Sequence, residues 1–152
     1  IVDEGQEKEA IIRLSRVGFD NVIGILDGGI EAWINAGKEI DSIETIDAVG
    51  LEQEMITDTE VTIFDVRKPG EFNSEHIQGA HHTALDVLHN HLEEFPSEGK
   101  FYIHCAGGYR SVIANSILKA HGIHNGIDVL GGYGAISKTE IPASKFVCPS
   151  TL

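Results

Sequence analysis

One cysteine in the second half of the chain lies where the sequence favours a reactive sulfur. Cys105 follows a short apolar stretch, Phe101 to His104, whose residues predict a strand. A glycine-bearing turn comes next, and apolar positions at helical spacing from Tyr109 predict a helix that ends at Gly122. Cys105 would therefore lie between a strand end and a helix start, where sites gather in open α/β sheets.

These surroundings favour the ionised form of Cys105. The start of a helix presents unpaired N–H groups and the positive end of the helix dipole. Gly107 and Gly108 allow consecutive amide groups to converge on one point, and the thiolate is the nucleophilic form of cysteine. Arg110 adds a fixed cation suited to an oxyanion of sulfur or phosphorus. We therefore predict a nucleophilic cysteine rather than an inert buried one.

The segment from Cys105 to Ser111, CAGGYRS, resembles the active-site loop of the rhodanese (sulfurtransferase) family. The resemblance implies that Cys105 carries sulfane sulfur as a persulfide, surrounded by loop amides, and that Arg110 braces the loop and helps to hold a donor's charge. It also implies substrate-binding residues in and near the loop: Ala106, Gly107, Gly108, Tyr109, Ser111 and Arg67. Related phosphatases of this fold have one more residue between cysteine and arginine, which suits phosphate, whereas the shorter loop suits one sulfur.

A second stretch also resembles the family. It reads DVRKPGEF from Asp65, followed by EHIQGA from Glu75, where the family usually has glycine in place of Glu75 and proline in place of Gln78. We expect a structural polar network near the catalytic face, made by Asp65, Arg67, Glu71 and His76. The alternative for Arg67 is that it attracts an anionic sulfur donor.

The pattern of elements predicts an α/β fold, with a mostly parallel sheet of about five strands and helices on both faces. The expected strands are Thr45–Ile46, Val61–Val66, His81–Thr83, Phe101–His104 and Asn125–Leu130. The expected helices are Ala48–Met55 with Asp47 as N-cap, a short helix after Pro69–Gly70, Ala84–Phe95, the helix that opens at Tyr109, and Tyr133–Ser137.

An internal repeat divides the chain. When Gly18 is aligned with Gly122, the two segments share helix, glycine stop, apolar strand, Gly-Gly and short helix. We expect residues 1–42 to be the C-terminal fragment of a preceding rhodanese-like domain and residues 43–152 to be a complete one. The fragment's closing Gly-Gly segment has a Trp that the second copy lacks. We expect its apolar side chains to be buried against the complete domain or a second chain, as in a homodimer: Ile11, Ile12, Leu14, Val22, Ile23, Ile25, Leu26 and Trp33.

Composition excludes several classes of partner. The chain has 152 residues, with 24 acidic and 11 basic side chains and a net charge of −13. Nucleic acids and anionic membranes require clustered Lys and Arg, so we expect neither. No apolar run approaches a membrane span.

Two cysteines make no disulfide framework, so we expect a reducing, cytoplasmic setting. The second, Cys148, could be a resolving thiol, an apolar anchor or a bystander.

The histidines do not predict a metal site. His81, His82, His89 and His91 lack a cysteine or carboxylate at a suitable spacing, and two of them diverge around the expected helix. We therefore expect no metal and no cofactor within this chain.

The predicted function is transfer of sulfane sulfur from thiosulfate or a low-molecular-weight persulfide to a thiol acceptor through Cys105. The alternatives are a non-catalytic rhodanese-like binding or regulatory module and a cysteine-dependent phosphatase or arsenate reductase of the same fold. A partial copy before a complete one also resembles the C-terminal part of a fusion. In such fusions a metallo-β-lactamase-fold persulfide dioxygenase or hydrolase comes first, which implies that domain as a partner.

Overall fold

The computed structural model describes residues 2, 4–16, 18, 21–58 and 60–148. The chain divides into two compact units, residues 1–42 and residues 43–152. The second unit contains the predicted site, and each unit is described by itself below.

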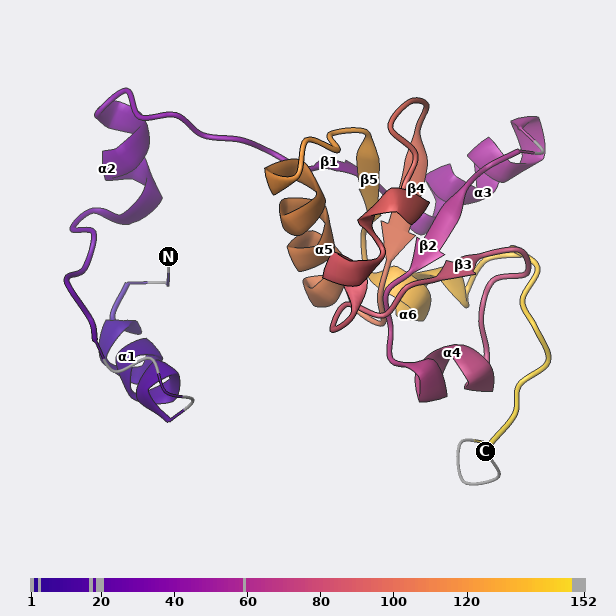
Figure 1. Ribbon diagram of the computed structural model, residues 1–152, viewed down its shortest axis with the longest axis horizontal. Coiled ribbons are helices and arrows are strands. Elements are labelled where there is room, and N and C mark those ends of the chain that lie inside the picture. Colours follow the sequence, from indigo (N-terminus) through magenta and orange to yellow (C-terminus); the bar gives the residue numbers. More distant parts are fainter. Residues whose placement is uncertain (1, 3, 17, 19–20, 59, 149–152) are drawn as a thin grey trace. The chain divides into compact units, whose positions relative to one another are not determined.

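The second unit is built on a five-stranded, all-parallel sheet with the strand order β1-β5-β4-β2-β3 (Figure 1). The strands are β1 (Glu44–Ile46), β2 (Ile63–Asp65), β3 (His81–His82), β4 (Phe101–His104) and β5 (Gly126–Val129). Strand β4 has a hydrogen-bonded neighbour on each side, β5 and β2. The predicted α/β class and the number of strands are confirmed, and Cys105 directly follows the central strand.

Helices cover both faces of this sheet. They are α3 (Ala48–Thr57), α4 (Pro69–Ser74), α5 (Tyr109–Ala120) and α6 (Gly132–Ile136), with two 3₁₀ turns, η1 (Leu88–Asn90) and η2 (Leu92–Glu94). The predicted N-cap of α3 is confirmed, because the Asp47 carboxylate accepts from the Gly50 N–H at 2.7 Å.

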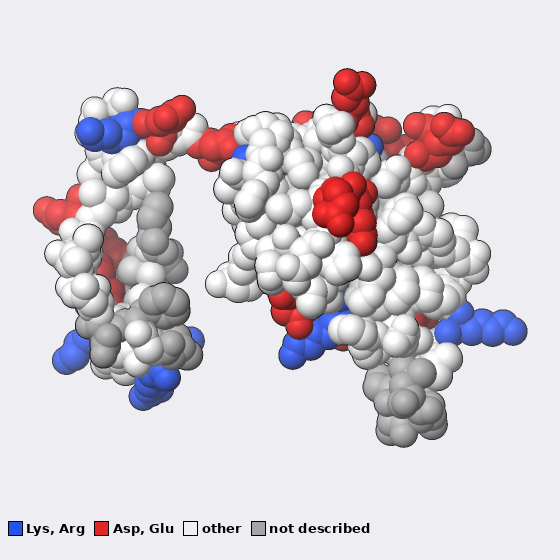
Figure 2. Space-filling view, viewed as in Figure 1, with Lys and Arg blue, Asp and Glu red and all other residues white. Residues whose placement is uncertain are grey.

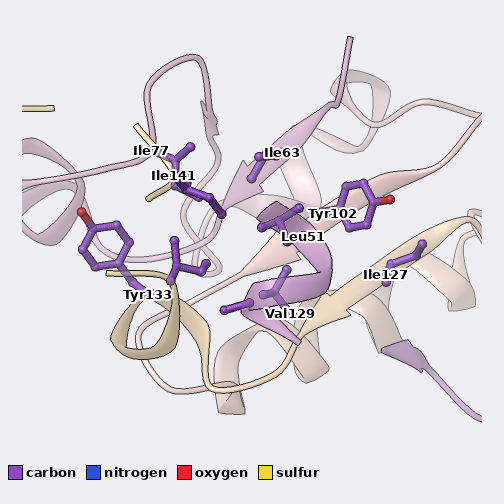
Figure 3. Packing of buried hydrophobic residues seen from close by; sticks show 10 residues of the cluster. Leu51, Ile63, Ile77, Tyr102, Ile127, Val129, Tyr133 and Ile141 are labelled. Atoms are coloured by element: carbon purple, nitrogen blue, oxygen red, sulfur yellow. The ribbon is translucent and has the colours of Figure 1, made fainter. Parts of the chain in front are cut away.

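Two apolar clusters fill the space between the sheet and its covering elements. One joins α3 and α6 to the sheet and includes Leu51, Tyr102, Val129 and Tyr133 (Figure 3). The other joins α5 and the 3₁₀ turns to the opposite face, and Cys105 lies within it together with Phe64 and Ile103. The thiol is thus set against the α5 side of the sheet.

The helix predicted over Ala84–Phe95 is wrong, since this stretch forms the turns η1 and η2 instead. The hydroxyl of Thr83 donates to the carboxylate of Glu94 at 2.9 Å. A continuous helix would separate these residues by roughly 16 Å along its axis. The chain folds back here, and both Leu88 and Phe95 still reach the core.

The first unit contains α1 (Glu7–Ser15) and α2 (Gly29–Asn35). The apolar stretch 21–26 is neither helix nor strand, so the strand expected there is not formed. A strand requires a partner for its backbone groups, and no described residue of this unit provides one. None of the described residues in α1 or α2 is buried, and the expected burial of their apolar side chains stays a prediction.

The surface carries the charge that the composition predicts. On the drawn face of the second unit, basic side chains are scattered rather than gathered into a patch (Figure 2). No helix among the described residues combines the length and the apolar character needed to cross a bilayer.

Candidate active site

The thiol of Cys105 is enclosed by the first turn of α5. Cys105 is 1% exposed. Its sulfur accepts a hydrogen bond from the N–H of Gly108 at 3.1 Å and from the hydroxyl of Ser111 at 3.6 Å. Gly108 has a φ of 105°, a left-handed conformation that glycine adopts without strain. The conformation turns its N–H toward the sulfur.

Two opposing effects act on the pKa of Cys105. Burial raises the pKa, since it disfavours the charged form. Hydrogen bonds from the Ser111 hydroxyl and from the N–H groups of Ser111, Gly108 and Gly107 favour the thiolate, and their combined effect lowers the pKa below its ordinary value. The loop therefore stabilises the nucleophilic form of the sulfur.

Helix α6 supports the loop from Cys105 to Ser111 by hydrogen bonds to its carbonyl groups. The N–H of Tyr133 donates to the carbonyl of Cys105 at 2.7 Å, and the N–H of Gly134 donates to that of Ala106 at 3.0 Å. Gly132 lies so close that an added Cβ would overlap the carbonyl oxygen of Cys105. The two carbonyls are satisfied from the α6 side, which leaves the loop's N–H groups directed at the sulfur.

Arg110 is anchored to α4 rather than directed at the sulfur. Its two terminal nitrogens donate to the carboxylate of Glu71 at 2.6 and 2.8 Å. The hydrogen bonds from Arg110 hold the pKa of Glu71 at about 2 against a smaller opposing effect of burial, and the Lys68 N–H also contributes. This geometry favours the bracing role for Arg110, because Glu71 pairs with its positive charge.

Arg67 lies in a buried network. It is 5% exposed and donates to both carboxylate oxygens of Asp65, at 2.6 to 2.9 Å. Its guanidinium also donates to the carbonyl of Glu75 at 2.7 Å and lies 4.1 Å from the ring centroid of Tyr133. These contacts favour the structural interpretation of Arg67 over attraction of an anionic donor.

His76 holds the C-terminal tail, residues 141–148, rather than the thiol loop, residues 105–111. Its ring stacks on Phe72 at a centroid distance of 3.9 Å, and its Nδ1 lies 2.8 Å from the Phe72 carbonyl oxygen. Its backbone N–H donates to the hydroxyl of Ser144 at 3.0 Å, and the Ser144 N–H donates back to its carbonyl. His76 is thus a structural residue of the contact between α4 and the tail, in which Cys148 is exposed.

The structure brings most of the predicted loop residues around the sulfur, and it adds some that the sequence analysis missed. Tyr109 is 81% exposed and lies outside the sulfur's hydrogen-bond shell. Tyr133 and Gly132 were missed as loop supports, although a Gly-Gly pair before a short helix signals a close backbone approach. Asp128, which is buried beside Ser111, carried no sequence signal.

A cavity of about 490 Å³ opens next to this site, between α4, α6 and the tail. It is lined by Arg67, Lys68, Gly70, Glu71, Ser74, Glu75, Tyr133 and Phe146. Glu71 and Tyr133 also hydrogen-bond residues of the thiol loop, so two residues of the cavity wall contact the loop. The part of the chain that the structure describes holds no group of three His, Cys, Asp or Glu side chains suited to a metal ion.

Comparison with known proteins identifies the class. The model of the rhodanese-like domain matches residues 50–139, which is more than half of the chain. The chain therefore belongs to the rhodanese-like domain family.

Individual relatives agree with this assignment. A Bacillus subtilis (strain 168) protein named "Putative sulfur carrier protein YrkF" is 29% identical over 98 residues, covering 64% of this chain and 53% of the relative. The uncharacterized protein YqhL of the same organism is 31% identical over 71 residues, 47% of this chain and 56% of YqhL. The chain thus spans about half the length of these curated relatives. A crystal structure of a rhodanese-like domain protein from Staphylococcus aureus has a TM-score of 0.59 and 31% identity, covering 62% of this chain and 91% of that one.

Proposed function

We propose that this protein is a sulfurtransferase in which Cys105 carries sulfane sulfur as a persulfide. The observation that carries the proposal is the enclosure of the Cys105 sulfur by donors from Gly108 and Ser111 at the start of α5. N–H and O–H donors in this position stabilise the negative charge of a persulfide anion. The similarity to a protein named as a sulfur carrier supports the same chemistry.

The reaction takes two displacements at sulfur. The Cys105 thiolate attacks the outer sulfur of the donor, and the bond from that sulfur to the rest of the donor breaks. The leaving group departs with the bonding electron pair, as sulfite from thiosulfate or as a thiolate from an organic persulfide. An acceptor thiolate then attacks the outer sulfur of the enzyme persulfide, which restores the Cys105 thiolate and yields a new persulfide.

A low-molecular-weight persulfide fits the site better than thiosulfate does. Thiosulfate is a compact dianion, yet both arginines near the loop are paired with carboxylates, Arg110 with Glu71 and Arg67 with Asp65. The cavity of about 490 Å³ has the size of a small-molecule site. It could take the organic part of a donor such as glutathione persulfide.

Two other functions compete with this proposal. A phosphatase or arsenate reductase uses its loop arginine to bind an oxyanion, but here the Glu71 carboxylate already neutralises the charge of Arg110 and accepts one N–H from each of its terminal nitrogens. A non-catalytic module would leave Cys105 unused, which gives no reason for a thiol whose pKa is lowered by Ser111 and loop amides despite burial.

Mass spectrometry tests the proposal directly. The protein is treated with thiosulfate or glutathione persulfide, and the peptide that contains Cys105 is searched for one added sulfur. We expect this mass on the wild type, none at this position in Cys105→Ser, and unchanged labelling in Cys148→Ser. A wild type that takes no sulfur on Cys105 from either donor would favour the binding module, and turnover of a small aryl phosphate would favour the phosphatase.

The proposal includes a partial domain copy in residues 1–42. Gly28 and Gly29 have φ values of 74° and 58°, close to the 75° and 54° of Gly131 and Gly132, and these pairs are offset by one residue from the alignment of Gly18 with Gly122. In both pairs a Cβ added to the first glycine would crowd the Cβ of the alanine four residues later, Ala32 or Ala135. These shared conformations support the repeat, in which α1 and α2 correspond to α5 and α6.

A repeat of this kind supports the presence of an upstream partner domain. We propose that this domain has the metallo-β-lactamase fold. The exposed apolar residues of α2, Ile30, Trp33 and Ile34, support either burial against such a neighbour or a homodimer. A reducing, cytoplasmic setting is part of the same proposal, because a persulfide carrier requires its thiol reduced.

A further inference from the structure

The cavity beside the thiol loop is lined by two charged side chains that have no charged partner. Four charged residues line this cavity, and two of them, Arg67 and Glu71, are held in ion pairs. Neither of the other two, Lys68 and Glu75, forms an ion pair with any described residue. Among the described residues, the cavity wall thus offers a ligand one cation and one carboxylate.

Helix α4 keeps these two charges apart. Lys68 is the N-cap of α4 and Glu75 is its C-cap, and a helix of this length separates them by about 10 Å along its axis. Glu71 lies between them in the same helix and binds Arg110 of the thiol loop. A ligand that used both charges would therefore extend along α4, with its centre next to the loop.

A tripeptide thiol has a matching distribution of charge. An extended chain of three residues spans about 10 Å. In glutathione persulfide the ammonium group lies at the glutamyl end, a carboxylate lies at the glycine end, and the central cysteine carries the sulfane sulfur. Thiosulfate has no cation for Glu75 and is too short to reach both ends of α4. The two unpaired charges therefore favour a peptide donor.

Tyr133 adds a hydrogen-bond donor to the same cavity wall. The residue is 9% exposed, and its hydroxyl has no hydrogen-bond partner among the described residues. The hydroxyl is directed away from Leu51 and Val129 (Figure 3). Burial raises the pKa of Tyr133 to about 12, with a contribution from the charge of Glu75, so the hydroxyl stays protonated at neutral pH. An unpaired buried hydroxyl is costly, and the carboxylate at the glutamyl end of the ligand would accept its hydrogen bond.

We propose that Lys68 and Glu75 are specificity-determining residues for a peptide donor: Lys68 binds the carboxylate at the glycine end of glutathione persulfide, and Glu75 binds the ammonium group at its glutamyl end. This inference rests on the proposed function for its purpose, but binding of the peptide can be measured without any sulfur transfer. Ion pairs of exposed side chains are individually weak, so selectivity comes from the use of both ends together.

Isothermal titration calorimetry with S-methylglutathione tests the site, because this ligand has both charged ends and no free thiol. We expect Lys68→Met and Glu75→Gln each to weaken binding about fivefold. The matched controls are Lys145→Met and Glu98→Gln, which remove the same charges at exposed positions outside the cavity lining and should change nothing. Unchanged affinity in Lys68→Met or Glu75→Gln, or an equal loss in the controls, overturns the proposal.

Modified ligands test the orientation and need only the wild type for their first measurement. Amidation of the glycine carboxylate should weaken binding to the wild type about fivefold and should leave nothing further for Lys68→Met to remove. Acetylation of the ammonium group should have the same relationship to Glu75→Gln. A reversed pattern, full additional losses in both combinations, or no binding of S-methylglutathione to the wild type overturns the proposal, even if a variant fails to fold.

The two proposals can fail separately. If S-methylglutathione binds as expected but Cys105 takes no sulfur from any donor, the sulfurtransferase proposal fails and the peptide site remains. If Cys105 takes sulfur from glutathione persulfide but binding of S-methylglutathione is independent of Lys68 and Glu75, the proposed function stands and this inference fails.

Discussion

The two terminal nitrogens of Arg110 donate to the two carboxylate oxygens of Glu71 at 2.6 and 2.8 Å, across 39 positions of sequence. This bidentate pair ties the thiol loop to α4 with a fixed geometry. The charge that the sequence offers to a substrate is thereby used to hold the loop in shape.

Replacing Glu71 by Gln should loosen that tie. We expect a loss of about 1 kcal/mol in the free energy of unfolding, since the pair is partly exposed. We also expect about tenfold lower kcat/KM for sulfur transfer, because the loop amides would no longer be held on the sulfur. Urea unfolding and a sulfur-transfer assay measure the two effects. Glu98→Gln, at an exposed turn residue, is the control and should change neither, and an active, equally stable Glu71→Gln would contradict the bracing role.

The same pair makes stability depend on acid pH. Arg110 lowers the pKa of Glu71 from 4.5 to about 2, so the folded state favours the carboxylate. Its contribution is complete above pH 4.5 and is lost as the pH falls toward 2. The difference in unfolding free energy between wild type and Glu71→Gln should therefore shrink through this window. A difference that is the same at pH 7 and pH 2.5 would show that ionisation of Glu71 is not its source.

Gly132 should tolerate no side chain. Its φ is 54°, and a Cβ would overlap the Cys105 carbonyl, so Gly132→Ala should cost about 3 kcal/mol and disturb the loop. Gly122→Ala is the matched control, since its φ is 85° but no atom lies within 4 Å of an added Cβ. We expect the control to cost about 1 kcal/mol and to keep persulfide loading on Cys105. Equal losses in the two variants would mean that backbone strain alone, and not the contact with the loop, matters at Gly132.

The cavity should select among donors. Phe146 is 65% exposed and forms part of the cavity wall. Phe146→Ala should raise the KM for glutathione persulfide by about fivefold through lost apolar contact, with no change for thiosulfate. Val147→Ala, beside it but outside the lining, serves as the control. Steady-state kinetics with both donors measure the split, and equal effects on the two donors would place the organic part of the donor elsewhere.

Sequence reasoning was most successful where the signals are local. Strand β4, the glycine turn and α5 are confirmed close to their predicted bounds, because residue spacing and glycine positions determine them. The helix expected over Ala84–Phe95 failed since a contact across this stretch, Thr83 with Glu94, overrides helical spacing. Neither the pairing of Arg110 with Glu71 nor the burial of Asp128 beside Ser111 could be predicted, because both depend on how distant segments pack.

The central place of β4 has a consequence for local unfolding of the sheet. Strand β4 is paired on both sides, whereas β3, at the edge, has a neighbour only in β2. Amide hydrogens of β4 should therefore exchange with solvent only when the whole sheet opens, while those of β3 exchange through small local fluctuations. Motions of α4 and the tail that admit or release a substrate can then occur without moving β4, the strand that positions the sulfur of Cys105.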